Sequence, residues 1–206
     1  MARIDLAGRL IVLEGLDFTG KSTQVRLLGE RLRRAGYDPV VTGEPGGTPV
    51  GDRARHVLLD PIYRGTLTPL SELLLFMVSR SQHVREVVLP ALSAGKVVLS
   101  SRYRLSSLAY QGYGRGIDLE MIRRLNDLAT EGREADLTFL LDVPVEIALG
   151  RRRGEPDRIE GEESAFYERV RRGFLELTAG DATVVRVDGT LEVRDLAETL
   201  AAALGL

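Results

Sequence analysis

The stretch from Gly15 to Ser22 most strongly constrains what this chain can fold into, because it has the pattern G-x-x-x-x-G-K-S. In such a loop the two glycines adopt backbone angles that other residues resist, so several N–H groups can point at one anion. Lys21 adds a positive charge, and the Ser22 hydroxyl is a suitable ligand for Mg²⁺. The motif predicts a nucleotide-phosphate site made of Gly15, Leu16, Asp17, Phe18, Thr19, Gly20, Lys21, Ser22 and Thr23.

The residues on either side of this loop fit a strand and a helix. Leu10–Leu13 is a short apolar run, and residues 21–35 have apolar side chains at helical spacing. Only two of the 28 basic residues are lysines, Lys21 and Lys96. A slim ammonium group suits the loop better than a planar guanidinium, so the lysine here adds weight to the motif. An ordinary glycine-rich turn is the less favoured alternative.

Short apolar runs alternate with helical patterns along the whole chain. The apolar runs are Leu10–Leu13, Pro39–Thr42, Lys96–Ser100, Leu137–Leu141 and Thr183–Val187. The helical patterns cover 21–35, 50–59, 69–93, 118–130, 144–150, 164–178 and 191–204. This order predicts an α/β fold of three layers, in which helices cover both faces of a parallel sheet of about five strands. Ligands are then expected at the carboxyl ends of the strands. The length of 206 residues suits a single domain, 1–206.

Composition excludes several classes of function. The net charge of −2 gives no overall basic field, which argues against nucleic acid or a membrane surface as a partner. The chain has no cysteine, which excludes disulfides and thiolate metal sites. No apolar run approaches the ~20 residues of a membrane span, and the first ten residues lack the apolar region of a signal peptide. We therefore expect a cytoplasmic protein.

The long helical pattern of 69–93 carries an aromatic and a basic side chain on one face. Phe76 and Arg80 are one helical turn apart, so together they could hold a flat base and an anion. The more ordinary interpretation is a core phenylalanine beside a solvated arginine. The buried stripe of this helix is expected to contain Leu70, Leu73, Leu74, Met77, Val84, Val87 and Val88.

Two further stretches follow predicted strands. Residues 43–49, GEPGGTP, form a loop that is either part of a site or a plain connection. Arg102 follows the third strand and is expected to point toward the phosphate zone. Ser, Tyr and Gln side chains over 106–111 could contact a polar planar ligand, the alternative being a helix start plus a glycine-rich loop.

The segment 150–163, GRRRGEPDRIEGEE, has Ile159 as its single apolar residue. Such a segment lacks packing of its own and is predicted to be mobile. We name it the lid segment. Its arginines Arg151, Arg152, Arg153 and Arg158 are candidates for bringing positive charge onto a transferring phosphoryl group. A solvated surface loop is the alternative.

Taken together, the motifs resemble those of the thymidylate kinase family, in its bacterial type with a catalytic arginine in the lid. The resemblance covers nearly the whole chain and rests on EGLDFTGKST, GEPGGTPVG, LLFMVSRSQHV, SRYRLSSLAYQGYGRG, LLDVPVE and RRRGEPDRIEG. It implies Mg²⁺-dependent transfer of the γ-phosphoryl group of ATP to dTMP, which gives dTDP and ADP, by a homodimer. The alternatives are a kinase for another pyrimidine monophosphate and a nucleotide-binding protein with weakened catalysis. No Asn-Lys-x-Asp motif supports a switch GTPase.

The resemblance also implies roles for residues. Asp17 would contact the deoxyribose 3′-hydroxyl, Phe76 would stack on thymine, and Arg102 would bridge the donor and acceptor phosphates. The implied dTMP pocket consists of Asp17, Glu44, Phe76, Arg80, Arg102, Ser106, Ser107, Tyr110 and Gln111. The implied catalytic residues are Lys21, Arg102, Arg153, Arg151 and Arg158. Phe18 stands where other members carry a P-loop arginine, so the resemblance implies a catalytic arginine in the lid, and Arg153 is the first choice because the stretch RGEPDRIE aligns it best.

Two positions depart from the family pattern. Ser101 stands where an aspartate is usual, and Gly43 stands where an arginine is usual. Ser22 is the expected Mg²⁺ ligand, together with phosphate oxygens and water, and Ser101 is a second candidate. A serine keeps an oxygen ligand but loses the charge, so we expect weaker metal binding or a lower rate.

Overall fold

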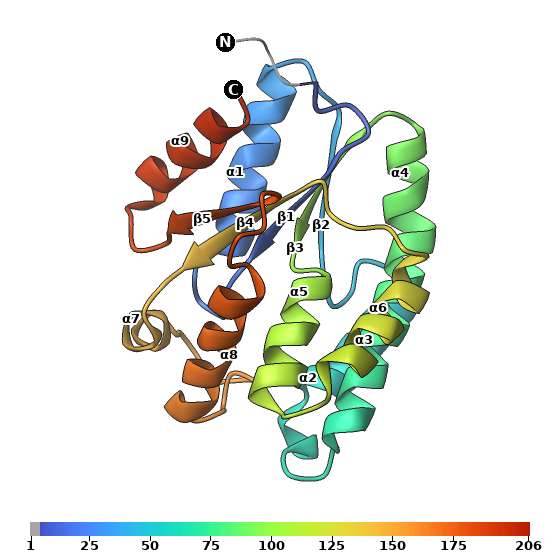
Figure 1. Ribbon diagram of the computed structural model, residues 1–206, viewed down its shortest axis with the longest axis vertical. Helices are drawn as coiled ribbons and strands as arrows, with labels where there is room; N and C mark the ends of the chain where they lie inside the picture. Colours follow the sequence, from blue (N-terminus) through green and yellow to red (C-terminus); the bar gives the residue numbers. More distant parts are fainter. Residues whose placement is uncertain (1–4) are drawn as a thin grey trace.

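The computed structural model describes residues 5–206, so the first four residues of the predicted domain 1–206 lie outside the described part. Five parallel strands form one sheet in the order β2-β3-β1-β4-β5, with helices on both faces (Figure 1). The strands are β1 (Leu10–Glu14), β2 (Pro39–Gly43), β3 (Val97–Ser101), β4 (Leu137–Asp142) and β5 (Val184–Asp188). The predicted α/β fold is confirmed, and each predicted strand differs by at most one residue at either end.

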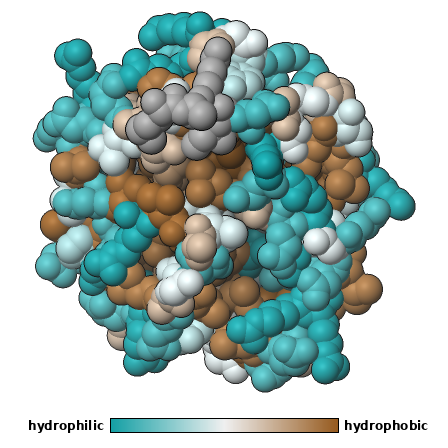
Figure 2. Space-filling view, turned by 45° about the horizontal axis from the view of Figure 1, so that its top comes forward, coloured by the Kyte–Doolittle hydropathy of each residue, from teal (hydrophilic) through white to brown (hydrophobic). Residues whose placement is uncertain are grey.

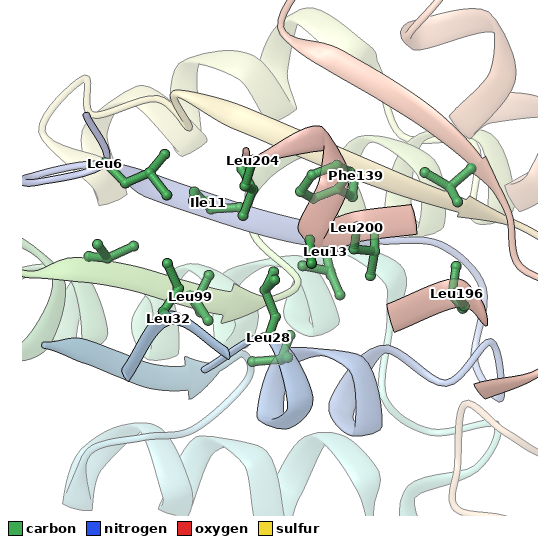
Figure 3. Close-up of a cluster of buried hydrophobic side chains, with 14 of the residues drawn as sticks. Leu6, Ile11, Leu13, Leu28, Leu32, Leu99, Phe139, Leu196, Leu200 and Leu204 are labelled. Carbon is green, nitrogen blue, oxygen red and sulfur yellow. The ribbon is translucent and has the colours of Figure 1, made fainter. Parts of the chain in front are cut away.

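Strand β1 lies in the middle of the sheet and is buried on both faces. On one face Ile11 and Leu13 pack with leucines of α1 (Lys21–Arg34) and α9 (Val193–Ala203), as Figure 3 shows. On the other face Leu10 and Val12 pack with Val84, Val88 and Ala91. Burial of these apolar side chains from both sides explains why the sequence shows continuous apolar runs rather than alternation.

The remaining helices are α2 (Pro49–Leu59), α3 (Pro69–His83), α4 (Leu89–Ser93), α5 (Arg104–Ser107), α6 (Leu119–Thr130), α7 (Val145–Gly150) and α8 (Ser164–Leu177). Among them, α2, α3 and α6 begin at residues whose side chains cap them. Thr48 and Thr68 accept hydrogen bonds from the N–H groups of Gly51 (3.0 Å) and Ser71 (3.3 Å), and a proline follows each of them. A capping hydroxyl followed by proline at the first helical position favours a helix start.

Two helical regions differ in detail from the sequence expectation. The predicted helix 69–93 is α3 and α4 joined by a π-helical turn over Val84–Val88. The glycine-rich stretch after α5 is helical through Gly114, so the alternative of a loop there was wrong. Its glycines serve close packing, because a Cβ on Gly114 would lie 2.6 Å from the ring of Phe166.

The surface mixes polar and apolar groups. On the face that Figure 2 displays, hydrophilic residues surround smaller groups of hydrophobic ones, as is usual for a folded chain. On α3, Leu73 and Met77 are buried, whereas Leu70, Leu74 and Val78 are each about half exposed. The prediction that Leu70 and Leu74 are buried was therefore wrong, because these two side chains lie beside the buried stripe of Leu73 and Met77 and remain about half exposed. Within residues 5–206, no helix is long and apolar enough to cross a membrane.

Candidate active site

A cavity of about 390 Å³ lies at the carboxyl edge of the sheet, where the fold predicts a ligand. We name it the edge cavity. Its lining residues are Asp17, Phe18, Gly20, Lys21, Ser22, Thr23, Glu44, Pro45, Arg55, Leu59, Phe76, Arg80, Ser101, Arg102, Ser106, Ser107, Tyr110, Gln111, Asp157, Ile159 and Glu160. All nine predicted acceptor residues are among them, although the chain separates them by up to 94 positions. Of the predicted phosphate loop, Gly15, Leu16 and Thr19 lie outside the lining.

The phosphate loop adopts backbone angles that glycine permits. Gly15 has φ 139° and Gly20 has φ 89°. A Cβ on Gly15 would also lie 2.6 Å from the carbonyl oxygen of Leu141, so a side chain is excluded there on two grounds. Gly20 is the N-cap of α1, which directs the positive end of the helix dipole at the loop.

Lys21 is buried beneath this loop. Its Nζ donates to the carbonyl oxygens of Gly15 (3.1 Å) and Leu16. Burial and the nearby charge of Arg102 lower its pKa to about 7, although Asp17 and Glu14 oppose that change. The ammonium group is therefore held by carbonyls that a phosphate group can replace.

Arg102 and Asp17, which both line the edge cavity, form an ion pair. Arg102 also donates to the carbonyl oxygen of Gly15 (3.2 Å) and to Ser106 Oγ (2.9 Å), and its guanidinium stacks 4.8 Å from the ring centroid of Tyr110. Tyr110 Oη donates to Asp17 Oδ2 (2.9 Å). Burial opposes ionisation of Asp17, but the charges of Arg102 and Lys21 hold its pKa below the ordinary value. This cluster presents a carboxylate, a guanidinium and a phenol beside the phosphate loop.

Glu14, at the end of β1, is a residue that the sequence reasoning missed. Its side chain is buried, and Oε1 accepts the backbone N–H groups of Tyr103 (2.8 Å) and Ser106 (3.1 Å). Burial raises the pKa of Glu14, while Ser106 and Arg102 act against that rise. The neighbouring Arg102 has φ 72°, in the left-handed region that disfavours a side chain. Glu14 therefore fixes the backbone that holds Arg102 in this conformation. In the sequence, an acidic residue at the end of an apolar strand was the pattern that indicated a role for Glu14.

Arg80 is a buried hub rather than a solvated charge, so the more ordinary interpretation of this residue was wrong. Its side chain is 1% exposed and pairs with Glu44 Oε2 at 2.7 Å. The guanidinium also donates to Ser107 Oγ (2.8 Å), Asn126 Oδ1 (2.5 Å) and the carbonyl oxygen of Tyr103 (2.9 Å). Burial acts against ionisation of Glu44, but Arg80 holds its pKa below the ordinary value. Phe76, one turn earlier, lies half-buried in the cavity lining.

Arg55, on α2, is a second residue that the sequence reasoning missed. It is exposed, it lines the edge cavity, and its Nη1 donates to the carbonyl oxygen of Pro45 (2.9 Å). It forms no ion pair with any residue of the described chain. A cation without an acidic partner at the mouth of a cavity is suited to an anionic ligand.

The lid segment divides into two parts. Arg152 and Arg153 are exposed, and Arg153 Nη1 donates only to the carbonyl oxygens of Gly150 (3.4 Å) and Arg152 (3.1 Å). Arg158 and Ile159 are buried, which corrects the expectation that the whole segment lacks packing. Arg151 Nη1 donates to the carbonyl oxygen of Gly189 (2.9 Å). No lid arginine lines the edge cavity.

Comparison with known proteins gives the family. A family model described as Thymidylate kinase matches residues 13–200, which is most of the chain. The chain belongs to the thymidylate kinase family. It is 50% identical to the thymidylate kinase of Pelotomaculum thermopropionicum over 177 residues, which are 84% of this chain and 82% of that protein. It is 46% identical to the thymidylate kinase of Nostoc punctiforme over 190 residues, 90% of each chain.

A solved structure agrees with this assignment. The crystal structure of thymidylate kinase from Ehrlichia chaffeensis is similar, with a TM-score of 0.77 and 32% identity, covering 97% of this chain and 100% of that chain. The resemblance noted in the motifs is thus confirmed at the level of the family.

The two departures from the family pattern lie side by side in the structure. Gly43 ends β2 directly opposite Ser101 at the end of β3, and a Cβ on Gly43 would lie 3.2 Å from the Cβ of Ser101. Ser22 and Ser101 both line the edge cavity. Within the described chain no three His, Cys, Asp or Glu residues gather as a metal site. These hydroxyl oxygens fit a hard cation such as Mg²⁺ only if phosphate oxygens and water complete its coordination.

Proposed function

We propose that this member of the thymidylate kinase family is an ATP-dependent dTMP kinase, which transfers the γ-phosphoryl group of ATP to dTMP and yields dTDP and ADP. One observation carries the proposal. The phosphate loop and an aromatic, polar acceptor pocket line the same edge cavity, with Arg102 between them. Phosphoryl transfer requires two phosphate groups held in line and neutralised, more than it requires a strong base.

The ATP phosphates would bind at the loop amides and the start of α1. Lys21 would exchange its carbonyl partners for phosphate oxygens, and the added negative charge would return its pKa toward the ordinary value. Mg²⁺, held by Ser22 and the phosphate oxygens with Ser101 as a further candidate, would supply additional charge neutralisation.

The acceptor dTMP would occupy the opposite side of the edge cavity. Its base would lie against Phe76, with Ser107 and Gln111 supplying polar groups at its edge. Asp17 would accept the 3′-hydroxyl, and the hydroxyl of Tyr110, 2.9 Å from Asp17 Oδ2, would disfavour a ribose 2′-hydroxyl beside it. Arg102 and Arg55 are the cations available for the acceptor phosphate.

Among the lid arginines, Arg153 is best suited to reach the transferring group. It is exposed and has only backbone partners, so few contacts oppose its movement. Arg151 is tied to Gly189, and Arg158 is buried. An arginine that reaches the developing charge on the phosphoryl group stabilises the transition state.

We further propose a homodimer that buries the exposed face of α3. Leu70, Leu74 and Val78 recur every four residues and are each about half exposed, which is unusual for three neighbouring apolar side chains on one helix face. Light scattering should give twice the chain mass, and Leu74→Glu should give the monomer. The expected cytoplasmic location stays a prediction, which imaging of a tagged chain would check.

A coupled assay of ADP release tests the main proposal with ATP, Mg²⁺ and, in turn, dTMP, dUMP, UMP, CMP and AMP. Turnover should be fastest with dTMP. Faster turnover with UMP or CMP would favour the alternative kinase for another pyrimidine monophosphate. Because Ser101 and Gly43 remove two usual charges, a second outcome is binding of ATP and dTMP without ADP formation, which would favour weakened catalysis.

A further inference from the structure

Glu72 of α3 joins three segments that are far apart in the sequence. Its side chain is 1% exposed, and it lies one helical turn before Phe76. Gln111 Nε2 donates to Oε1 at 2.8 Å, Arg115 Nη2 donates to Oε2 at 3.1 Å, and Arg158 Nη1 pairs with Oε2 at 2.7 Å. One buried carboxylate thus contacts the acceptor pocket, the helical stretch after α5 and the lid segment.

Arg158 is anchored to the body of the protein by more than this pair. Its Nε donates to the carbonyl oxygen of Leu58 (2.7 Å), and its backbone N–H donates to the carbonyl oxygen of Leu59 (2.9 Å). Both carbonyl groups lie at the end of α2. Its Nη2 is buried without a hydrogen-bond partner in the described chain. A buried guanidinium with an unsatisfied nitrogen depends on a strong partner for its remaining atoms. Glu72 is that partner.

The charges of the cluster balance. Arg115 also pairs with Glu162 through Nη1 at 2.6 Å, so two carboxylates face two guanidinium groups. The carboxylate of Glu162 is 29% exposed, whereas that of Glu72 is 1% exposed. Loss of the Glu72 charge would leave two cations facing a neutral group away from water, whereas loss of the Glu162 charge would occur where solvent compensates.

These contacts hold one part of the lid segment against the rest of the protein. Residues 157–162 are fixed by Arg158, by the Arg115–Glu162 pair and by Arg64, whose Nη2 donates to the carbonyl oxygen of Asp157 (3.2 Å). We call these residues the docked part. Residues 152–155 are exposed and contain Arg153. Any closure of the exposed part would therefore pivot at the docked part.

We propose that Glu72 is a positioning residue with two tasks. The first is to orient the Gln111 amide in the acceptor pocket. The second is to anchor the docked part of the lid segment through Arg158, so that the exposed lid arginines close from a fixed end. Gln111 Nε2 donates its hydrogen bond to Glu72. The Oε1 atom of Gln111 is therefore left to accept a hydrogen bond from the acceptor. The proposal rests on the proposed function, since it assigns Gln111 to the acceptor and Arg153 to the transferring phosphoryl group.

Three variants separate the two tasks, and hydrogen exchange followed by mass spectrometry in the protein without nucleotides reports the anchor directly. Arg158→Met removes the anchor and keeps Gln111 on Glu72, so kcat should fall roughly tenfold to 100-fold while the KM for dTMP stays within about threefold. Amides 157–162 should exchange faster. Glu72→Gln should show the same fall in kcat and, in addition, a rise of about tenfold in the KM for dTMP. Glu120→Gln is the matched control, because it removes an exposed carboxylate that pairs with Arg124 on α6, and kcat and KM should stay within about twofold of the unaltered chain.

Other outcomes overturn the proposal. If Arg158→Met lowers kcat while amides 157–162 exchange at the original rate, Arg158 acts directly on the phosphoryl group and the anchor is refuted. If Glu72→Gln matches the unaltered chain in kcat and KM, Glu72 positions nothing. If Glu72→Gln does not fold, the exchange rates and the kcat–KM split of Arg158→Met still decide. Because exchange is measured without substrate, it remains informative even if dTMP is not the acceptor.

Discussion

The phosphate loop and the acceptor pocket are neighbours in one cavity, yet they are built in different ways. The loop is eight consecutive residues whose shape follows from two glycines, a buried strand and a helix start. The acceptor pocket is assembled from four separate stretches of the chain and is held by buried ion pairs, among them Glu44–Arg80 and Glu72–Arg158. We therefore expect the Lys21 charge in the loop to serve binding with little effect on the fold, whereas the charges of the pocket hold the fold together.

The strongest test of this difference is Lys21→Ala. Within residues 5–206, the hydrogen bonds of Lys21 Nζ all go to atoms of its own loop, so its removal should leave the core unchanged and abolish turnover, a fall in kcat of at least ~10³-fold. Steady-state kinetics and the urea midpoint of unfolding measure the two effects. Near-normal turnover would refute the role of the loop in phosphoryl transfer. A large loss of stability would show that the Lys21 charge also stabilises the fold.

The second test concerns the exposed part of the lid segment. Arg153→Ala should lower kcat by ~10³-fold if the side chain reaches the transferring phosphoryl group, with stability unchanged because no acidic partner is lost. Arg172→Ala is the control, since that residue is exposed on α8 and lies 3.8 Å from its partner Glu176. An unchanged kcat would remove Arg153 from the mechanism.

The third test addresses the pocket. Arg80→Met removes the guanidinium from the buried carboxylate of Glu44 and leaves it with the His83 ring, whose Nδ1 lies 3.1 Å away, so the free energy of unfolding should fall by about 3–5 kcal/mol. Arg55→Met is the matched control, because Arg55 is exposed and its loss should change stability by no more than about 0.5 kcal/mol. Both variants are measured by urea denaturation. Equal stabilities would mean that the buried pair does not hold the pocket.

The smallest expected effect concerns the protonation of Lys21 in the phosphate loop. The pKa of Lys21 is about 7 in the free protein, and bound phosphates raise it, so ATP binding should take up nearly one proton at pH 8.5 and little at pH 6. Affinity for Mg²⁺–ATP should accordingly fall as the pH rises above 7. Calorimetric titrations in buffers of different ionisation enthalpy measure the uptake. A value of zero at pH 8.5 would show that Lys21 is already charged before ATP binds.

The sequence predicted the fold and the place of the site because both depend on local patterns. Runs of apolar residues define buried strands, helical spacing defines the covering layers, and the glycines at 15 and 20 define the loop. The Ser, Tyr and Gln side chains over 106–111 all line the edge cavity, where the sequence pattern predicted that they could contact a planar ligand. Parallel strands bring their carboxyl ends to one edge in any fold of this class.

The tertiary structure alone decided the surroundings of the charged side chains. In sequence Arg80, Arg153 and Arg158 look alike, but two of them are buried against carboxylates and one is exposed. Glu14 and Arg55 acquire their places only when strands, helices and loops meet at the edge of the sheet. Whether an arginine can be buried depends on the groups within a few ångströms of it, because the free-energy cost of burying a charge depends on its partner. That partner comes from a distant segment, which local patterns do not specify.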